Sequence, residues 1–377
     1  MRPLDLVSKD LSNRLVIEVF MLIRIKRQSD KTLSFIEVYQ FMTKAIRTNI
    51  LRLWLFFCLC STQGTTLAAD PLMLRTANNH PQDYPTGLAI KYMGTLLEKW
   101  SDGKIAIKLY SGGQLGEEKD TLEITIFGGI DLNRINMAPL NSIVPETNVL
   151  ALPFLFRSTA HLRTVLDGPI GDEILNSFEP YGLIGLAYYD SGARSFYNNK
   201  RAIYKPADLN GLKIRVQNSA LSVAMVNALG ANPTTMEFGQ VYESLLLGTI
   251  DGSENNWPSY ESTGHYEAAT HYTLTKHTMM PEVLVMSKHR WQKLTEQQQR
   301  LIRRAAKASV PYMREQWDKR VDMSRQKVVE AGVKIIENPD LSYFSDAMTP
   351  VYEQFVVSEK MRDLLKRIQE TNVESDS

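Results

Sequence analysis

The sequence contains little cysteine, and all of it lies near the N-terminus. Among 377 residues the two cysteines are Cys58 and Cys60, both inside one short apolar run. The chain after residue 69 can therefore form no disulfide, no thiolate metal site and no cysteine nucleophile. A disulfide-stapled scaffold and the thiol-dependent enzyme classes are excluded for this part of the protein.

Familiar catalytic and nucleotide-binding motifs are also missing. None of the six histidines forms an H-E-x-x-H pair, and the sequence has no G-x-S-x-G elbow, no P-loop and no G-x-G-x-x-G turn. Glu117 and Glu118 are adjacent carboxylates, but two acids that open a helix also interact favourably with its dipole. We therefore expect no enzyme, no bound metal and no cofactor.

The sequence also lacks an excess of charge of either sign. Forty-three lysines and arginines balance 42 aspartates and glutamates, which gives a formal net charge of +1. A nucleic-acid-binding protein usually carries a clear basic excess, so no nucleic-acid partner is expected.

The first 69 residues have the composition of a processed leader. Basic residues at 44, 47 and 52 precede the apolar run 53–60, and Thr66-Leu-Ala-Ala69 supplies small residues for cleavage. The run is far shorter than the roughly 20 residues of a membrane span. We expect a secretory signal cut after Ala68 or Ala69. Translation starting at Met42 would make 1–41 an upstream extension, whereas a membrane anchor at 15–23 is disfavoured by Glu18.

Strand and helix patterns alternate after the leader, which predicts an α/β fold. A strand at 72–76 precedes a helix from Pro85 whose apolar stripe would be Leu88, Tyr92, Met93, Leu96, Leu97 and Trp100. A second strand is expected at 104–110, a helix opening at Glu117 follows it, and a third strand begins after Gly128. A length of 377 residues suggests about two domains.

A second unit is centred on a short strand that carries one arginine. Asn210-Gly211 is a turn signal, after which Leu212, Ile214 and Val216 alternate with Lys213, Arg215 and Gln217. Arg215 should therefore project from the face opposite the buried one. Such a residue is either an ordinary solvated arginine or a functional one. Helices are expected at about 219–229 and 240–247.

The chain is expected to return to the first unit at 283–287. A long helix should begin after Thr295, because Thr295 and Gln298 form a capping box, and it should kink at Pro311.

Several motifs together resemble one known family, the DctP-like solute-binding proteins of TRAP transporters, from about Leu72 to Phe355. The motifs are Gln114-Leu-Gly-Glu-Glu118, Ala151-Leu-Pro-Phe154, Asp208-Leu-Asn-Gly-Leu-Lys-Ile-Arg215-Val, Gly230-Ala-Asn-Pro233, Val241-Tyr-Glu-Ser-Leu245 and Gly248-Thr-Ile-Asp-Gly-Ser-Glu-Asn255. The resemblance implies a two-lobed periplasmic binding protein fold. Each lobe would be a mixed sheet flanked by helices, and hinge strands and a long helix would join the lobes.

The same resemblance implies the domain limits and the partners. Lobe I would comprise 70–191 and 282–320, and lobe II would comprise 192–281 and 321–377. The protein would be a periplasmic monomer that binds an organic acid and delivers it to a permease with one small and one large membrane subunit.

The resemblance also assigns ligand-binding residues. Arg215 takes the position of the arginine that forks onto the ligand carboxylate, a geometry that lysine cannot reproduce. Asn136 departs from the sialic-acid members, which have a carboxylate there, and Arg134 adds a cation. The other contacts that it implies are Arg194, Asn255, Glu118 and Asn79. His80 adjoins these positions, and either a contact with a sugar ring or ordinary packing would explain it.

This set suits a sugar acid. Two segments resemble those of members that bind hexuronates such as glucuronate or galacturonate, namely Arg134-x-Asn-x-Ala-Pro139 and Tyr189-Asp-Ser-Gly-Ala-Arg194. C4-dicarboxylates or other small organic acids are the alternative ligands. A ligand-sensing receptor partner and a periplasmic sugar-acid enzyme, with Glu118 as its acid, are the alternative functions.

Overall fold

The structure of the protein is a computed structural model that describes residues 70–373, together with eight scattered residues (21, 24, 36, 39, 40, 43, 44 and 47) of the preceding segment. The chain divides into two units, 1–69 and 70–377. Apart from these eight residues, the expected signal peptide and upstream extension lie outside the described part of the chain. Within the described part, no helix is long and apolar enough to cross a membrane.

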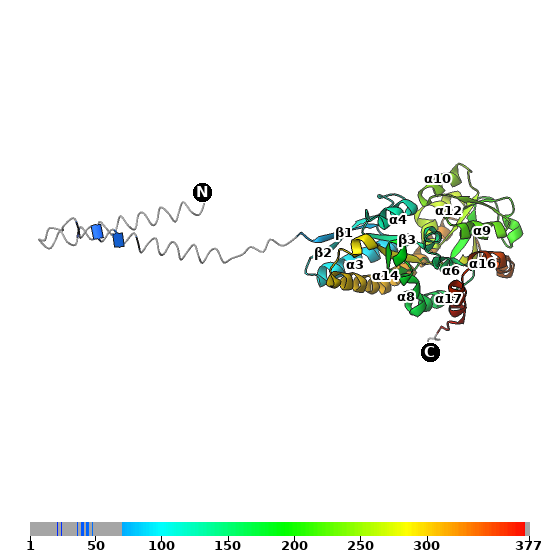
Figure 1. Ribbon diagram of the computed structural model, residues 1–377. Helices are drawn as coiled ribbons and strands as arrows, with labels where there is room; N and C mark the ends of the chain where they lie inside the picture. The colour runs from blue at the N-terminus through cyan, green and yellow to red at the C-terminus, as the bar shows by residue number, and fades with distance from the viewer. Residues whose placement is uncertain are drawn as a thin grey trace. The chain divides into compact units, whose positions relative to one another are not determined.

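A five-stranded mixed sheet forms one half of the second unit (Figure 1). Its strand order is β2-β1-β3-β10-β4. β1 is parallel to both β2 and β3, whereas β10 is antiparallel to both β3 and β4. The strands are β1 (Leu72–Ala77), β2 (Ile105–Tyr110), β3 (Leu132–Asn136), β4 (Leu183–Tyr189) and β10 (Glu282–Ser287). The expected return of the chain at 283–287 is therefore confirmed, and it is the returning strand that makes this sheet mixed.

Helix α3 (Pro85–Trp100) covers this sheet, and its buried face overlaps the expected stripe at Met93 and Leu97 but not at Tyr92. Its fully buried apolar side chains are Ala89, Ile90, Met93 and Leu97, and Gly94 approaches Ile107 of β2 so closely that an added Cβ would lie 3.4 Å from the Ile107 Cβ. Tyr92 is instead 37% exposed and stacks on Tyr312, with 4.6 Å between the ring centroids. The buried face of the helix therefore includes small residues as well as large ones, and Tyr92 lies outside it.

A six-stranded sheet forms the other half, in the order β11-β9-β5-β8-β6-β7. Its strands are β5 (Arg194–Asn198), β6 (Lys213–Val216), β7 (Asn232–Thr235), β8 (Gly252–Asn255), β9 (His271–Thr278) and β11 (Lys334–Ile336). β6 is parallel to β7 and β8, whereas β5 is antiparallel to β8 and β9. The expected helices next to the arginine strand are α9 (Ala220–Ala228) and α10 (Val241–Leu246).

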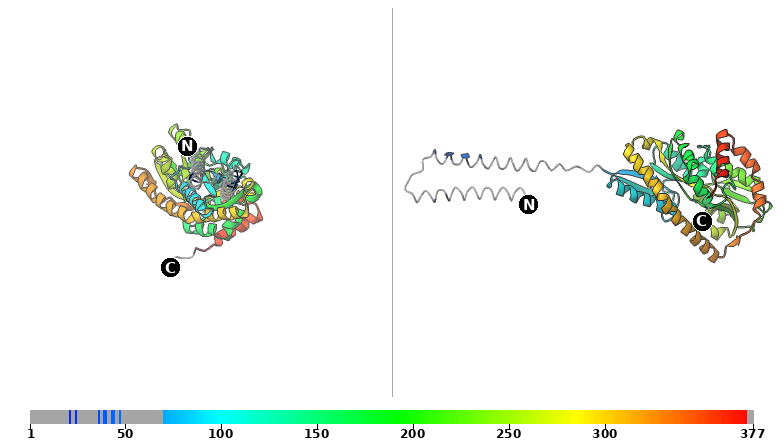
Figure 2. Two further views of the ribbon diagram at one scale, coloured as in Figure 1. Left: turned by 90° about the vertical axis from the view of Figure 1, so that its left-hand side faces the viewer. Right: turned by 90° about the horizontal axis from the view of Figure 1, so that it is seen from below.

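The long helix α14 (Glu296–Glu330) runs along one side of the described unit (Figure 2). Thr295 accepts from the Gln298 backbone N–H and Gln298 accepts from the Thr295 N–H, so the expected capping box is confirmed. The helix continues through Pro311. It packs on α3, on β4 and on α11 (Trp257–Ser262), and so connects the halves that contain the two sheets.

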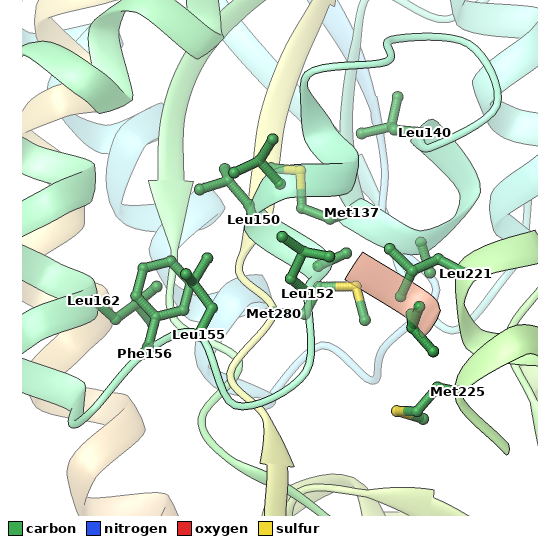
Figure 3. Packing of buried hydrophobic residues seen from close by; sticks show 14 of the residues in the cluster. Met137, Leu140, Leu150, Leu152, Leu155, Phe156, Leu162, Leu221, Met225 and Met280 are labelled. Carbon is green, nitrogen blue, oxygen red and sulfur yellow. The ribbon is translucent and has the colours of Figure 1, made fainter. Parts of the chain in front are cut away.

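The largest apolar core also spans both halves. In Figure 3, Met137, Leu152 and Met280 lie near Leu221 and Met225 of α9, and all belong to one buried cluster.

The remaining helices are α4 (Glu118–Ile126), α5 (Met137–Leu140), α6 (Thr147–Ala151), α7 (Thr159–Asp167), α8 (Pro169–Asn176), α12 (His265–Ala268), α13 (Lys288–Trp291), α15 (Leu341–Asp346), α16 (Thr349–Phe355) and α17 (Glu359–Glu370), with short 3-10 turns η1 (Glu179–Tyr181), η2 (Pro206–Leu209) and η3 (Phe238–Gln240). α16 packs on α9 and α17 on α6 and α8, so the C-terminal helices contact both halves. The lobe limits given above stay our proposal.

Candidate functional site

Arg134, on β3, is the centre of a buried polar network in the first half. It is 1% exposed, and its guanidinium donates to Glu118 Oε1 at 2.8 Å, to Asn78 Oδ1 at 2.9 Å and to Asn79 Oδ1. A second carboxylate, that of Glu282 on β10, lies 3.2 Å away. The structure therefore brings the expected residues Arg134, Glu118 and Asn79 together, and two carboxylates already neutralise this arginine.

His80 joins the network through Glu282. Its Nε2 lies 3.3 Å from Glu282 Oε1, while its Nδ1 is buried and has no hydrogen-bond partner among the described residues. Burial, with the positive charge of Arg134, lowers the pKa of His80. Burial alone would raise the pKa of Glu282, but Arg134 and the hydrogen bond from His80 outweigh it and hold that pKa below its usual value. A neutral His80 thus donates to an ionised Glu282 and presents Nδ1 as a free acceptor.

Asn136 ends β3 and begins α5. Its side-chain oxygen accepts from the Ala138 N–H at 3.2 Å, and its backbone N–H donates to Glu118 Oε1 at 3.1 Å. Glu118 at the start of α4 therefore ties α4 to both Arg134 and Asn136. These are the groups of the first half that the sequence assigned to a ligand site.

Arg194, on β5, is neutralised within the second half. Its guanidinium donates to Glu254 Oε2 at 2.5 Å and to Glu254 Oε1 at 2.8 Å, and it also donates to Asn255 Oδ1 at 2.8 Å. Burial alone would lower the pKa of Arg194, but the Glu254 carboxylate raises it. Burial alone would raise the pKa of Glu254, but the Arg194 guanidinium and the His277 ring, whose Nε2 lies 3.4 Å away, lower it to about 2. This is a buried, bidentate ion pair.

Arg215, on β6, is buried differently. It is 3% exposed, which shows that the outer face of its strand is covered rather than solvated. Its Nε and Nη2 both donate to the carbonyl of Met236, at 2.9 and 2.7 Å. No carboxylate of residues 70–373 lies within ion-pairing distance of it. Burial lowers the pKa of Arg215, the opposite of the shift in Arg194.

The strand register sets which side chains share a face with Arg215. Arg215 pairs with Ser253 of β8, and Ser253 pairs with Tyr197 of β5, so these three project from one face of the sheet. Asn255 lies two residues beyond Ser253 and therefore on the same face. Glu254 projects from the other face, toward Arg194. The expected pair Arg215 and Asn255 thus shares one surface, and Arg194 also donates to Asn255.

Hydrogen bonds join the two halves around this region. Glu117 Oε1 accepts from the Gly239 N–H at 3.3 Å, Asn141 Nδ2 donates to Ser219 Oγ at 3.0 Å, and the Tyr84 hydroxyl lies 2.9 Å from Ser259 Oγ. The His80 ring of the first half lies 5.4 Å from the Phe238 ring of the second, measured between centroids. The two sets of expected residues therefore face a common interface between the halves.

Sequence reasoning missed two of the three counter-ions of this site, Glu254 and Glu282. Glu254 lies inside the Gly248–Asn255 motif, directly before the expected Asn255, so its position was visible but its pairing was not. Glu282 precedes the apolar residues of β10 and carried no local signal, because only the antiparallel register places it opposite Asn136. Among residues 70–373 no group of three or more histidines, cysteines, aspartates or glutamates could hold a metal ion.

Comparison with known proteins identifies the family to which this arrangement is related. Residues 76–359 match the family described as bacterial extracellular solute-binding protein, family 7. The 2,3-diketo-L-gulonate-binding periplasmic protein YiaO of Escherichia coli K12 is 34% identical over 318 residues, which cover 83% of this chain and 95% of that protein.

Two solved structures are more similar in sequence. A TRAP periplasmic solute-binding protein from Bradyrhizobium sp. BTAi1, in complex with α/β-D-galacturonate, is 55% identical with a TM-score of 0.78, over 79% of this chain and 99% of that one. One from Chromohalobacter salexigens, with bound D-glucuronate, is 41% identical with a TM-score of 0.77, over 79% and 99% of the two chains.

Proposed function

The chain belongs to family 7 of the bacterial extracellular solute-binding proteins, and we propose that it captures a hexuronate such as galacturonate or glucuronate in the periplasm for a TRAP permease. The permease, with its small and large membrane subunits, is the partner that the family implies. The protein acts by binding and release, without changing its ligand chemically.

The observation that carries the proposal is the unpaired burial of Arg215. Removing an ionised side chain from water costs several kcal/mol unless an opposite charge compensates for it. Arg134 and Arg194 have carboxylates at 2.5–3.2 Å, whereas Arg215 has one backbone carbonyl. A ligand carboxylate would supply the missing charge and accept from the guanidinium with strong, charge-assisted hydrogen bonds.

The surroundings of Arg215 favour an acid with one carboxylate and several hydroxyls. A second ligand carboxylate would have to approach arginines that Glu118, Glu254 and Glu282 already neutralise. Hydroxyl groups, by contrast, can both donate to and accept from such polar groups. His80 Nδ1 is an available acceptor for one of them. A hexuronate fits this pattern better than a C4-dicarboxylate.

Isothermal titration of the ligand-free protein with galacturonate, glucuronate and succinate tests the ligand class. We expect micromolar or tighter affinity for at least one hexuronate, which corresponds to about 8 kcal/mol or more, and the recovered sugar acid should be unchanged. Tight binding of succinate with no response to either hexuronate would reject the proposal in favour of dicarboxylates. Conversion of the acid during incubation with excess protein would instead support an enzyme.

Arg215→Lys tests the role of the guanidinium. Lysine keeps the charge but loses the planar fork, so affinity for the hexuronate should fall at least tenfold while the fold survives. Arg300→Lys, on an exposed part of α14, is the matched control and should bind like the wild type. Full affinity in Arg215→Lys would show that another group binds the carboxylate.

Uptake of a labelled hexuronate by cells tests the partner. Deleting the gene for this protein should abolish uptake through the cognate permease, and the wild-type protein supplied in trans should restore it. Normal uptake in the deletion strain, combined with tight binding in vitro, would instead favour a ligand-sensing role.

A further inference from the structure

His265 is a buried polar residue beside the proposed carboxylate site that the resemblance does not assign. It is the first residue of α12 and is 1% exposed. Its Nδ1 lies 2.7 Å from the Tyr197 hydroxyl, while its Nε2 is buried with no hydrogen-bond partner among residues 70–373. A buried polar atom without a partner is rare in proteins and calls for an explanation.

The direction of the hydrogen bond with the Tyr197 hydroxyl sets which ring nitrogen of His265 carries the proton. Burial raises the pKa of Tyr197, so the phenol stays protonated and can donate to Nδ1. The neutral imidazole then carries its own proton on Nε2. Burial and the charge of Arg215 lower the pKa of His265 to about 3, which keeps the ring neutral at physiological pH. When Tyr197 donates to Nδ1, the unpartnered Nε2 is a neutral N–H donor.

This donor lies in the neighbourhood of Arg215. Tyr197, which holds the imidazole, shares one face of the sheet with Ser253 and Arg215 through the strand register. The His265 ring lies 6.1 Å from the ring of Phe238, two residues beyond the Met236 carbonyl that accepts from Arg215. Phe238 in turn contacts His80 of the first half. The Phe238 ring thus packs against the rings of both His80 and His265, each of which has a nitrogen without a hydrogen-bond partner.

We infer that His265 binds the ligand directly, with its Nε2–H donating to a hydroxyl or ring oxygen of the sugar acid whose carboxylate Arg215 holds. The inference rests on the proposed function and adds a specificity contact from the second half. A neutral donor of this kind recognises an uncharged oxygen, so it distinguishes a polyhydroxylated acid from an aliphatic one. His80 Nδ1 and His265 Nε2–H then form a complementary acceptor and donor.

Two substitutions separate the hydrogen bond from the shape of the ring. His265→Phe keeps an aromatic ring and removes the donor, so hexuronate affinity should fall about 10-fold, the loss typical of a buried polar partner. His265→Gln places an amide N–H near the position of Nε2 and should recover most of that loss. His271→Phe is the control, because His271 precedes Tyr272 on β9 and projects from the opposite face to Tyr197.

Titration calorimetry on all four proteins gives the result. Weakened binding in His265→Phe, with binding near the wild type in His265→Gln and His271→Phe, supports the contact. Equal affinity in His265→Phe and the wild type overturns it, while wild-type hexuronate binding still upholds the proposed function. Absence of hexuronate binding in the wild type itself rejects the proposed function instead.

Nitrogen-15 NMR of the wild-type histidines provides a second measurement that needs no variant. The His265 signals should show the tautomer protonated at Nε2, with the Nε2–H resonance shifting when the hexuronate binds and becoming protected from exchange. A tautomer protonated at Nδ1, or an Nε2–H resonance that the ligand leaves unchanged, would overturn the inference.

Discussion

Arg215 and Arg194 are both buried arginines on neighbouring parts of one sheet, and replacing each by methionine should change stability by very different amounts. Methionine keeps a long, flexible side chain and removes the charge, so the comparison isolates the electrostatic difference. Arg194 pairs with Glu254, whereas Arg215 has no carboxylate of residues 70–373 within ion-pairing distance. The two variants should therefore separate a structural arginine from a ligand-binding one.

Arg194→Met leaves the Glu254 carboxylate buried, at 3% exposure for the whole residue, without its guanidinium. Removing one member of a buried ion pair costs about 3–5 kcal/mol. His277 Nε2, 3.4 Å from the same carboxylate, can compensate in part, so we expect a loss near 3 kcal/mol. In thermal unfolding that corresponds to a Tm lower by roughly 6 °C.

Arg215→Met loses the hydrogen bonds to the Met236 carbonyl, a loss of about 1.5–3 kcal/mol. It also removes a buried cation whose desolvation costs several kcal/mol and is uncompensated in the ligand-free protein. The two effects offset each other, so the Tm without ligand should lie within about 2 °C of the wild type or above it.

Differential scanning calorimetry with and without hexuronate completes the comparison. Ligand at about 100 times its Kd should stabilise the wild type by roughly 2.7 kcal/mol, whereas Arg215→Met should show no such gain. If ligand-free Arg215→Met is destabilised as strongly as Arg194→Met, Arg215 is a structural residue whose charge the protein itself satisfies, and the argument for an anionic ligand fails.

Two further predictions concern stability. Folding lowers the pKa of Glu254 from 4.5 to about 2, mainly because Arg194 outweighs the effect of burial. Ionised Glu254 therefore contributes about 3 kcal/mol to the free energy of unfolding above about pH 4.5, and this contribution disappears as the pH falls toward 2. Urea unfolding across this range should show a smaller acid loss in the Arg194→Met/Glu254→Gln double variant. Thr295→Ala breaks the capping box of α14 and should cost about 1 kcal/mol, with hexuronate affinity unchanged in calorimetry; an unchanged unfolding midpoint would contradict it.

The elements of the fold that could be predicted are those encoded over a few neighbouring residues. The capping box of Thr295 and Gln298 depends on groups three residues apart, and it appears in the structure as expected. The strand of Arg215 follows from the turn at Asn210-Gly211 and the period-2 alternation after it. Such signals do not depend on how distant parts of the chain pack.

The features that could not be predicted depend on distant parts of the chain. Alternation shows that Arg215 lies on the face opposite Ile214, but not that Met236 and neighbouring segments cover that face. The pairing of Arg194 with Glu254 spans 60 residues, and that of Arg134 with Glu282 depends on an antiparallel strand from much later in the sequence. In α3, the expected stripe was right for Met93 and Leu97 but wrong for Tyr92, and it omitted Gly94, which lies close to Ile107 of β2.

The distribution of charge around the site connects these observations to ligand capture. Three buried arginines, Arg134, Arg194 and Arg215, lie among three buried glutamates, but both Glu118 and Glu282 contact Arg134, which leaves Arg215 without a counter-ion. Since the two halves meet around Arg215, bringing them together without an anion would bury its charge at a cost of several kcal/mol. A carboxylate bound there removes that cost, so the contacts between the halves form most favourably when the ligand is present, and a ligand that binds the joined halves more tightly shifts the population toward them.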